Sequence, residues 1–552
     1  MKKKLNANNF KRQMLENGYL YEQLPPCFTT QTFAEKVDEV FEVVKGKKYV
    51  TIPTTISMYK NDGTRRIVSV PNPLSFASAV HVFSSNWTIC RKFADSSNSQ
   101  SNITFILEYE DSAGQKIERE FINSERQRDR LGVVSHFLHS LRERIIVSLG
   151  RPYKLSLDIA TFYDSIYTHS LAWSMCGKEP AKRWHSLVAN KEDKKHPELK
   201  PKYYDQADKL DCAIRRMKGN ETNGIVTGPF LSRIFSEMLL CGIDNVLRER
   251  AGFVFKRYVD DYSFYFHSEA EAERGLANIE SVLHEFGLNL NPVKTRVERY
   301  PFGIADDLHK RLKMAYESEG VYGLLSEASR ADVEGSKGAF KYALKMLQRK
   351  ADPKKEDPID IPILMNIGIS RPGCSILALL YLRRRRATLD INQVGATLNG
   401  MIAGAVEDGL GQEALNAIYY CRELKVHLTS CNIVEVLKKG DDLCRLIALD
   451  YVHNRSELID YQAGGMGDVG LAEAELSQRL RGETTDGSHW LLIYESLNHG
   501  FLDVSLGEGV TAEAMRQLAL LGVSFYEGFA DPNFEWATEV TTNEQQPDSL
   551  IA

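Results

Sequence analysis

The stretch that most constrains the fold runs from Phe253 to Phe266 and reads FVFKRYVDDYSFYF. Aromatic and β-branched residues dominate it, and such residues favour strands. Two neighbouring carboxylates, Asp260 and Asp261, interrupt the run, so we predict two strands joined by a tight β-hairpin turn. Burying an acidic pair beside an apolar sheet is unfavourable unless a cation balances it, and hard divalent cations bind carboxylate oxygens. The alternative is an ordinary hairpin whose turn happens to be Asp-Asp, since aspartate is a common turn residue.

A further aspartate, Asp158, lies about a hundred residues upstream, at the end of an apolar segment that begins at Leu155 and is predicted to be a strand. Alone, an aspartate there would most often cap the helix that follows. Together with Asp260 and Asp261, it can converge on two metal ions spaced ~4 Å apart, an arrangement that supports in-line phosphoryl displacement.

Four segments, taken in order, resemble the motifs of reverse transcriptases. Asp158–Ile166 resembles motif A, Thr222–Leu239 motif B, Tyr258–Asp261 (YVDD) motif C and Phe286–Thr295 motif D. Single motifs recur freely by chance, whereas four in the right order and spacing are a specific signal.

Motif B departs from the common family pattern at two positions. The chain has Thr227 where glutamine is usual and Glu237 where asparagine is common, while it keeps Gly228, Pro229 and Ser232. This pattern resembles the bacterial antiviral reverse transcriptases, the abortive-infection and "unknown group" enzymes, more than the retroviral or group II intron enzymes.

The resemblance implies a set of catalytic and metal-binding roles. Asp158 and Asp260, with the main-chain carbonyl of Ile159, are expected to hold two Mg²⁺ ions, with Mn²⁺ as an alternative, and Asp261 to add negative charge. Lys294, on a strand-like segment, takes the family position of a general acid for the leaving pyrophosphate, although an exposed lysine is the alternative.

The resemblance also implies nucleotide contacts. Tyr163 takes the sugar-gate position, where a bulky ring excludes a ribose 2′-hydroxyl; a core tyrosine is the alternative. Gly228 and Pro229 form a turn whose glycine permits close approach to a nucleotide or template base. Arg65 or Arg66 can contact the triphosphate or the template backbone, because guanidinium groups match phosphate geometry; solvated hairpin arginines are the alternative.

Composition bounds the compartment and the partners. Nine scattered cysteines without a CxxC pair indicate reduced thiols, so we expect a cytoplasmic protein. The sequence has no run of eighteen apolar residues, and we expect no membrane partner. The net charge of −5 is compatible with nucleic-acid binding, which needs only local basic surfaces.

These features predict an α+β fold: a right-hand polymerase with fingers, palm and thumb, followed by an all-α C-terminal domain. The expected regions are an N-terminal extension (1–60), fingers (61–150) with a β-hairpin within 95–121, palm (151–300), thumb-like helices (301–350), a helical domain (351–537) and an acidic flexible tail (538–552). A charged, proline-rich linker is expected over 352–362. Short apolar segments predict helices at 373–387, 390–408, 411–423, 430–438, 440–453, 468–482, 488–498 and 511–524. Describing that domain as HEAT-like rests on the resemblance.

The resulting hypothesis is an RNA-directed DNA polymerase of reverse-transcriptase type in bacterial antiphage defence. Its expected partners are dNTPs and RNA or DNA; association into homo-oligomers and the phage trigger stay open. Relatives with this architecture can use a protein hydroxyl as primer, sometimes without a template. Two alternatives remain: a conventional RNA-templated enzyme of a retron or mobile element, and a non-catalytic nucleic-acid-binding or phage-sensing scaffold. The sequence has no Walker loop and no H-E-x-x-H or G-x-S-x-G motif.

Overall fold

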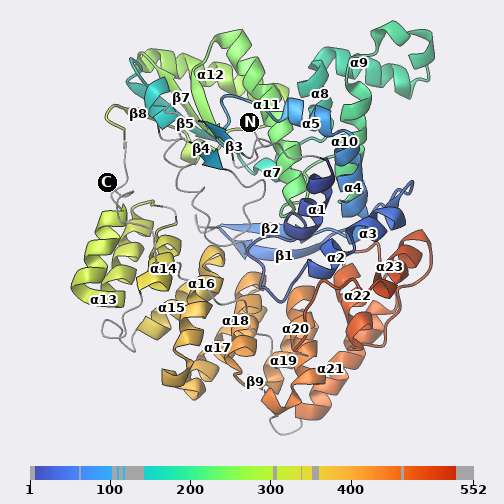
Figure 1. The fold of residues 1–552 in the computed structure, drawn as a ribbon, viewed down its shortest axis with the longest axis vertical. Coiled ribbons are helices and arrows are strands. Elements are labelled where there is room, and N and C mark those ends of the chain that lie inside the picture. The colour runs from blue at the N-terminus through green and yellow to red at the C-terminus, as the bar shows by residue number, and fades with distance from the viewer. Residues whose placement is uncertain are drawn as a thin grey trace.

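The computed structural model describes residues 7–60, 64–101, 108–110, 116–118, 142–302, 308–336, 338–350, 360–461 and 465–529. The predicted acidic tail at 538–552 lies outside these residues. Figure 1 shows a β-containing half packed along one row of helices that forms the C-terminal half. Within the described ranges, no helix has both the length and the apolar composition needed to cross a membrane.

The N-terminal part is helical and leads into a two-stranded hairpin. Its helices are α1 (Ala7–Asn17), α2 (Gln31–Glu35) and α3 (Val37–Val44). Strands β1 (Thr54–Tyr59) and β2 (Arg65–Val70) pair antiparallel and are followed by α4 (Pro73–Ser85) and α5 (Trp87–Phe93). Strands β3 (Glu108–Glu110) and β4 (Lys116–Glu118) also pair antiparallel, which confirms the hairpin predicted within 95–121.

The central part is built on a four-stranded antiparallel sheet. Its strand order is β6 (Phe255–Tyr258), β7 (Asp261–Phe266), β5 (Tyr153–Asp158), β8 (Arg296–Arg299). The helices of this part are α7 (Phe162–Ser165), α8 (Ser170–Cys176), α9 (Lys178–Ala189), α10 (Tyr204–Arg216), α11 (Phe230–Ala251) and α12 (Glu269–Glu285).

Aromatic residues of the hairpin hold the sheet against the helices. Phe255, Phe264 and Phe266 are buried, and the rings of Phe255 and Phe264 lie 4.8 Å apart. Helix α12 packs on β5 and β7, and a Cβ at Gly275 would come within 2.5 Å of the Phe266 ring. The glycine therefore allows this close contact between helix and strand.

The C-terminal half is a succession of helices with short connections. They are α13 (Leu308–Val333), α14 (Ala339–Lys350), α15 (Asp360–Ser370), α16 (Ser375–Arg384), α17 (Ile391–Glu407), α18 (Gly411–Leu424), α19 (Ser430–Lys439), α20 (Asp442–Asn454), α21 (Gly465–Leu480), α22 (Trp490–His499) and α23 (Val510–Leu520), with the short parallel strands β9 (Leu428–Thr429) and β10 (Ile459–Asp460). Each of the eight segments predicted beyond residue 370 contains a helix. HEAT-like regularity stays a prediction.

Two local predictions were wrong. The linker was expected to reach Pro362, but α15 begins at Asp360, because a proline in the first turn of a helix removes an N–H that has no intrahelical partner there. Lys294 was expected on a strand-like segment, but it ends the 3₁₀ turn Pro292–Lys294, whose preceding Asn291 side chain accepts a hydrogen bond from the Val293 N–H.

The helical half is bonded directly to the β1–β2 hairpin. The Tyr59 N–H donates to the Gln412 side chain at 2.9 Å, and the Trp490 indole donates to the Val70 carbonyl at 3.2 Å. The Arg65 guanidinium forms two 2.8 Å bonds with the Glu413 carboxylate. These contacts join residues more than 300 positions apart, so the two halves share one packed structure.

Candidate active site

A two-residue turn carries the acidic pair. Tyr258 of β6 pairs with Asp261 of β7, which leaves Val259 and Asp260 as the turn. Val259 has φ +55°, a left-handed value that a β-branched side chain rarely adopts. A positive φ at the first turn position is the pattern of a type II′ turn, where glycine is the usual residue. The predicted tight hairpin is confirmed, with a strained turn.

The sheet register brings the distant aspartate to this turn. Asp158, the last residue of β5, lies directly opposite Asp261 of β7. Directly opposed residues in an antiparallel pair have Cβ atoms roughly 4.5–5.5 Å apart on the same face of the sheet. Asp158 and Asp261 therefore project from the same face, and Asp260 is the adjoining residue. The convergence predicted for the three aspartates is present in the backbone.

Asp158 is held by two side chains of the segment after α12. The Asn291 amide donates to its carboxylate at 3.0 Å, and the Lys294 ammonium lies 3.2 Å from it. The Asn291 N–H also donates to the Asp158 carbonyl at 2.8 Å. Asp158 is only 8% exposed, so these donors replace much of the water that its carboxylate would bind. Lys294 thus lies beside the catalytic candidate, as the motif resemblance implied.

Mutual repulsion acts on the acidic group. Burial, followed by the charges of Asp261 and Asp158, raises the pKa of Asp260 to about 6, while the Asp260 N–H and Lys294 oppose the shift. Three carboxylates near one turn with one lysine form a site where additional positive charge would be stabilising.

The donor chemistry of this site fits a hard divalent cation, since carboxylate oxygens are the ligands that Mg²⁺ prefers. The side chains as they stand are not assembled around an ion: within the described ranges, no group of three or more His, Cys, Asp or Glu side chains is arranged to hold a metal. Ile159 is buried next to Asp158, and its bridge to Leu290 uses the backbone of residues 158 and 160. The Ile159 carbonyl, which was predicted to be a metal ligand, therefore takes no part in the hydrogen bonds of that bridge.

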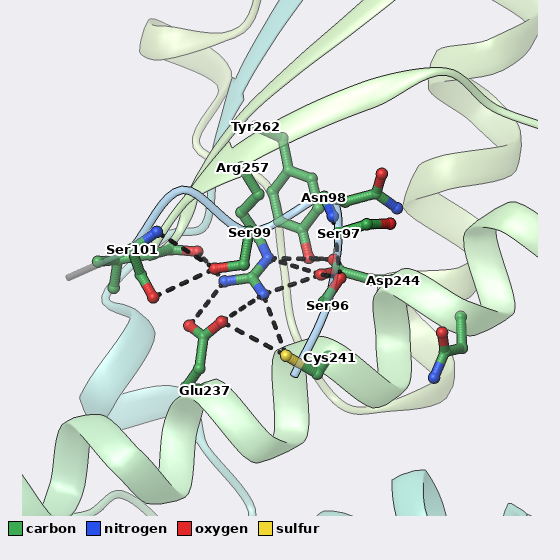
Figure 2. Close-up of polar contacts among 12 residues, drawn as sticks. Ser96, Ser97, Asn98, Ser99, Ser101, Glu237, Cys241, Asp244, Arg257 and Tyr262 are labelled. Carbon is green, nitrogen blue, oxygen red and sulfur yellow. Dashed lines mark hydrogen bonds and ion pairs between the residues drawn. The ribbon is translucent and has the colours of Figure 1, made fainter. Parts of the chain in front are cut away.

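Beneath the turn lies a buried charged network, shown in Figure 2. Arg257 of β6 is fully buried and bonds Glu237 and Asp244, both from α11, at 2.8–3.1 Å. The Tyr262 hydroxyl donates to Asp244 at 3.1 Å. Burial alone would raise the pKa of Glu237, but Arg257 brings it below its usual value; for Asp244 burial prevails and its pKa is raised.

Tyr163 lies beside the acidic site. It follows Phe162 at the start of α7, and its pKa is raised by burial, with smaller effects from Arg233 and Asp260. The residue is half-buried, and its ring packs against Phe162, with centroids 5.5 Å apart. The charge of Arg233, a residue of α11, acts on both Tyr163 and Tyr21.

The other predicted nucleotide contacts are placed differently. The Arg66 guanidinium bonds the Tyr21 hydroxyl and lies 5.0 Å from the Tyr21 ring centroid. The charges of Arg66 and Arg233 both act on Tyr21. The pair with Glu413 directs Arg65 toward the helical half, and this pair would have to break before Arg65 could bind phosphate.

Gly228 and Pro229 lead into α11, and the glycine packs against β2. A Cβ at Gly228 would come within 2.8 Å of the Ser69 carbonyl, and φ there is +135°. The Ser69 N–H donates to the Thr227 carbonyl at 2.7 Å. The close backbone approach that Gly228 permits is therefore to β2 of this chain. A contact with nucleotide stays a prediction.

Sequence reasoning missed three residues that contact the site or its immediate surroundings: Asn291, Arg233 and Arg257. Asn291 stood inside the motif D segment and Arg233 inside motif B, but neither was singled out. Arg257 precedes Tyr258, and the departure at Glu237 was the available signal, because an unusual acidic residue in a buried helix requires a cationic partner.

Comparison with known proteins gives no family. No protein-family model matches the sequence, and no curated protein matches it. Among solved structures, apo telomerase from Candida tropicalis matches with TM-score 0.30 and 12% identity over 75% of this chain and 68% of that chain. Telomerase from Candida albicans in complex with a TWJ fragment of telomeric RNA matches with TM-score 0.28 and 12% identity over 75% and 67%. TM-scores of this size do not establish a shared fold.

Proposed function

We propose that this protein is a reverse-transcriptase-type nucleotidyltransferase that extends DNA by two-metal-ion chemistry at Asp158, Asp260 and Asp261. The observation that carries the proposal is the register of β5 against β7, which opposes Asp158 to Asp261 and puts Asp260 in the adjoining turn. Residues more than a hundred positions apart in sequence thereby form one acidic site.

Electrostatics supports a cation-dependent reaction. Burial, together with the charges of Asp261 and Asp158, raises the pKa of Asp260, and Lys294 contacts Asp158. Asp158 and Asp260 would hold the two ions, with Asp261 and the Ile159 carbonyl as further donors. Bound Mg²⁺ would lower the pKa of the attacking 3′-hydroxyl and neutralise charge on the triphosphate.

The chain's own residues supply the remaining steps. Tyr163 would exclude a ribose 2′-hydroxyl and so select deoxynucleotides. Lys294 would donate a proton to the leaving pyrophosphate, because its ammonium already lies beside the acidic site. Arg66 of β2 would contact phosphate when it exchanges Tyr21 for an anionic partner.

The finer role we propose is antiphage defence, supported by the motif B residues Thr227 and Glu237, which resemble the bacterial antiviral enzymes. In that role synthesis would begin on a protein hydroxyl and would proceed with or without an RNA template. Plaque counts in bacteria expressing wild type or Asp260→Asn test the role: protection by wild type alone supports it, and equal plaque counts in the two strains contradict it.

Incubation of the purified protein with labelled dNTPs and Mg²⁺, with and without RNA, tests the activity. Product that follows an RNA template supports copying, and product without RNA supports template-independent synthesis. Label that stays on the protein after denaturation indicates self-priming. Absence of product under both conditions overturns the enzymatic proposal in favour of a nucleic-acid-binding or phage-sensing scaffold. Asp503→Asn is the matched control, because it makes the same change at an aspartate whose side chain is 85% exposed.

A further inference from the structure

The buried network beneath the acidic turn reaches the turn itself. Besides its bonds to Glu237 and Asp244, Arg257 donates from Nη1 to the Val259 carbonyl at 2.9 Å. That carbonyl belongs to the residue immediately before Asp260 and to the peptide unit that joins the two turn residues. A fully buried guanidinium therefore bonds the backbone that carries the candidate metal ligand.

Val259, whose carbonyl accepts this bond, is also the residue with a strained backbone conformation. Val259 has φ +55°, and its β-branched side chain disfavours that conformation. Residues held in sparsely populated conformations persist where surrounding contacts determine them, and such strain concentrates at functional sites. The Arg257 bond is such a contact, since loss of it would free the Val259 carbonyl to rotate and carry Asp260 with it.

The guanidinium itself is fixed from two sides. Glu237 accepts from Nη1 and Nη2 at 3.0 Å each, and Asp244 accepts from Nε and Nη2. Both carboxylates lie on α11, and two bidentate contacts orient a planar guanidinium more strictly than one. Lysine in place of Arg257 would keep the charge but lose this fork geometry.

The outer edge of β6 adds a third support. The Arg257 N–H donates to the Asn98 carbonyl at 2.8 Å, and its carbonyl accepts from the Gln100 N–H. Ser96 donates to Asp244 at 3.1 Å. Figure 2 shows this serine-rich segment lying along the network. Arg257 is thus held at its backbone and at its side chain, which leaves the turn as the part that it can position.

We infer that Arg257, clamped by Glu237 and Asp244, is a positioning residue that holds Val259 in its left-handed conformation and thereby places Asp260 for cation binding. The inference rests on the proposed function, because it takes Asp260 as a metal ligand. It also gives the unusual Glu237 a role: its carboxylate fixes one edge of the guanidinium, and Nη1 of the same group bonds the turn.

The test compares Arg257→Lys with a matched control, Arg445→Lys. Arg445 of α20 is also a buried arginine, bonded to Asp442 at 2.8 Å and to the Leu437 carbonyl at 3.1 Å. Mn²⁺ affinity is measured by electron paramagnetic resonance, and hydrogen exchange is followed in the peptide spanning 255–262. We expect Arg257→Lys to weaken Mn²⁺ binding by about 10-fold or more and to accelerate exchange in this peptide, with Arg445→Lys unchanged in both.

Kinetics separates positioning from nucleotide binding. For dNTP incorporation, we expect Arg257→Lys to lower kcat with little change in KM for dNTP, because the variant alters the metal ligand and not the nucleotide contacts. Adding Val259→Asn to Arg257→Lys should recover part of the Mn²⁺ affinity, since asparagine tolerates positive φ. A purely structural role predicts faster exchange with unchanged Mn²⁺ affinity and no recovery, and that result overturns the inference.

Two further outcomes are distinguishable. If wild type neither binds Mn²⁺ nor incorporates dNTPs, the proposed function fails. If wild type does both and Arg257→Lys matches it, the positioning inference alone fails. Should Arg257→Lys not fold, Glu237→Gln replaces it, because this variant keeps the shape and loosens one side of the guanidinium; a smaller loss of Mn²⁺ affinity is expected, and wild-type affinity contradicts the inference.

Discussion

Two acidic clusters lie at the β6–β7 hairpin, and they differ in how their negative charge is balanced. Below the turn, Glu237 and Asp244 surround Arg257, and all three side chains are buried. At the turn, Asp158, Asp260 and Asp261 gather, and Lys294 lies 3.2 Å from Asp158. In the lower cluster one guanidinium bonds both carboxylates. In the upper cluster the charges of Asp261 and Asp158 add to burial in raising the pKa of Asp260 to about 6. The difference indicates that the lower cluster holds the fold and the turn in place, whereas the upper cluster has negative charge available to a cation from solution.

The lower cluster should show the largest effect on stability. Arg257→Met leaves two buried carboxylates without a counter-charge, and we expect it to lower the free energy of unfolding by about 3–5 kcal/mol in urea denaturation. Arg311→Met, which breaks partly exposed pairs with Glu327 and Glu334, should lower the free energy of unfolding far less, because solvent screens such pairs. Equal losses in the two variants would remove the distinction between the buried network and ordinary ion pairs.

The upper cluster should show the largest effect on activity. Asp260→Asn removes a proposed metal ligand, and we expect the rate of dNTP incorporation to fall roughly 10²–10³-fold, the size of losing one preorganised electrostatic group. The fold should persist, because the substitution removes repulsion. Wild-type incorporation by Asp260→Asn would contradict a catalytic role for the turn.

Substitution of Lys294 tests how much of the negative charge at the turn is offset by this lysine. Lys294→Ala should lower the single-turnover rate by roughly 10²-fold, the lower end for loss of a general acid. Lys313→Ala is the control, since its ammonium lies 4.0 Å from Glu317 on the partly exposed surface of α13. If both variants react at the wild-type rate, Lys294 only offsets the charge of Asp158.

The pH dependence of stability distinguishes the clusters without any assay of activity. The pKa of Asp260 is raised to about 6, so its protonated form stabilises the fold at low pH. That contribution is lost as pH rises from the unfolded-state pKa, near 4, through 6. We expect a loss of about 1–2 kcal/mol across this window without divalent cation, absent in Asp260→Asn. Mg²⁺ should restore stability above pH 6; an identical profile for the two proteins would contradict the repulsion.

The smallest effect should come from the pair that joins the two halves of the molecule. Arg65 and Glu413 are partly exposed, with side chains 28% and 13% accessible. A double-mutant cycle with alanine at both positions should give a coupling of about 0.5–1 kcal/mol, since solvent screens such pairs. A coupling near that of the buried Arg257 network would show that burial is not what separates the clusters.

Local patterns predicted the elements that carry the site. The aromatic and β-branched residues on both sides of the acidic pair in Phe253–Phe266 predicted the hairpin, and the short apolar segments predicted the C-terminal helices, because each signal lies within a few residues of chain. That Asp158 can converge with Asp260 and Asp261 was predicted from their positions at a strand end and in a hairpin, and the resemblance to known motifs agreed with it. The register that opposes Asp158 to Asp261 was not predicted, since strand register over such a separation is not encoded in either strand alone.

Contacts between distant segments could not be predicted in the same way. Arg65 looked like a phosphate ligand, yet its partner Glu413 lies 348 positions away. Val259 gave no sign of positive φ, because its conformation is imposed by Arg257 and by the strand pairing around it. The Asn291 backbone bonds the Asp158 carbonyl, and a 3₁₀ turn begins at the next residue. In this arrangement the Asn291 amide also bonds the Asp158 carboxylate.

Divalent-cation binding tests the central claim most directly. Mn²⁺ titration at pH 7.5, followed by electron paramagnetic resonance, compares wild type with the double variant Asp158→Asn/Asp260→Asn. We expect saturable binding by wild type and its loss in the double variant, with Asp503→Asn unchanged. Equal Mn²⁺ binding by wild type and the double variant, or none by wild type in the presence of dNTP, would contradict the assignment of these aspartates as a metal site.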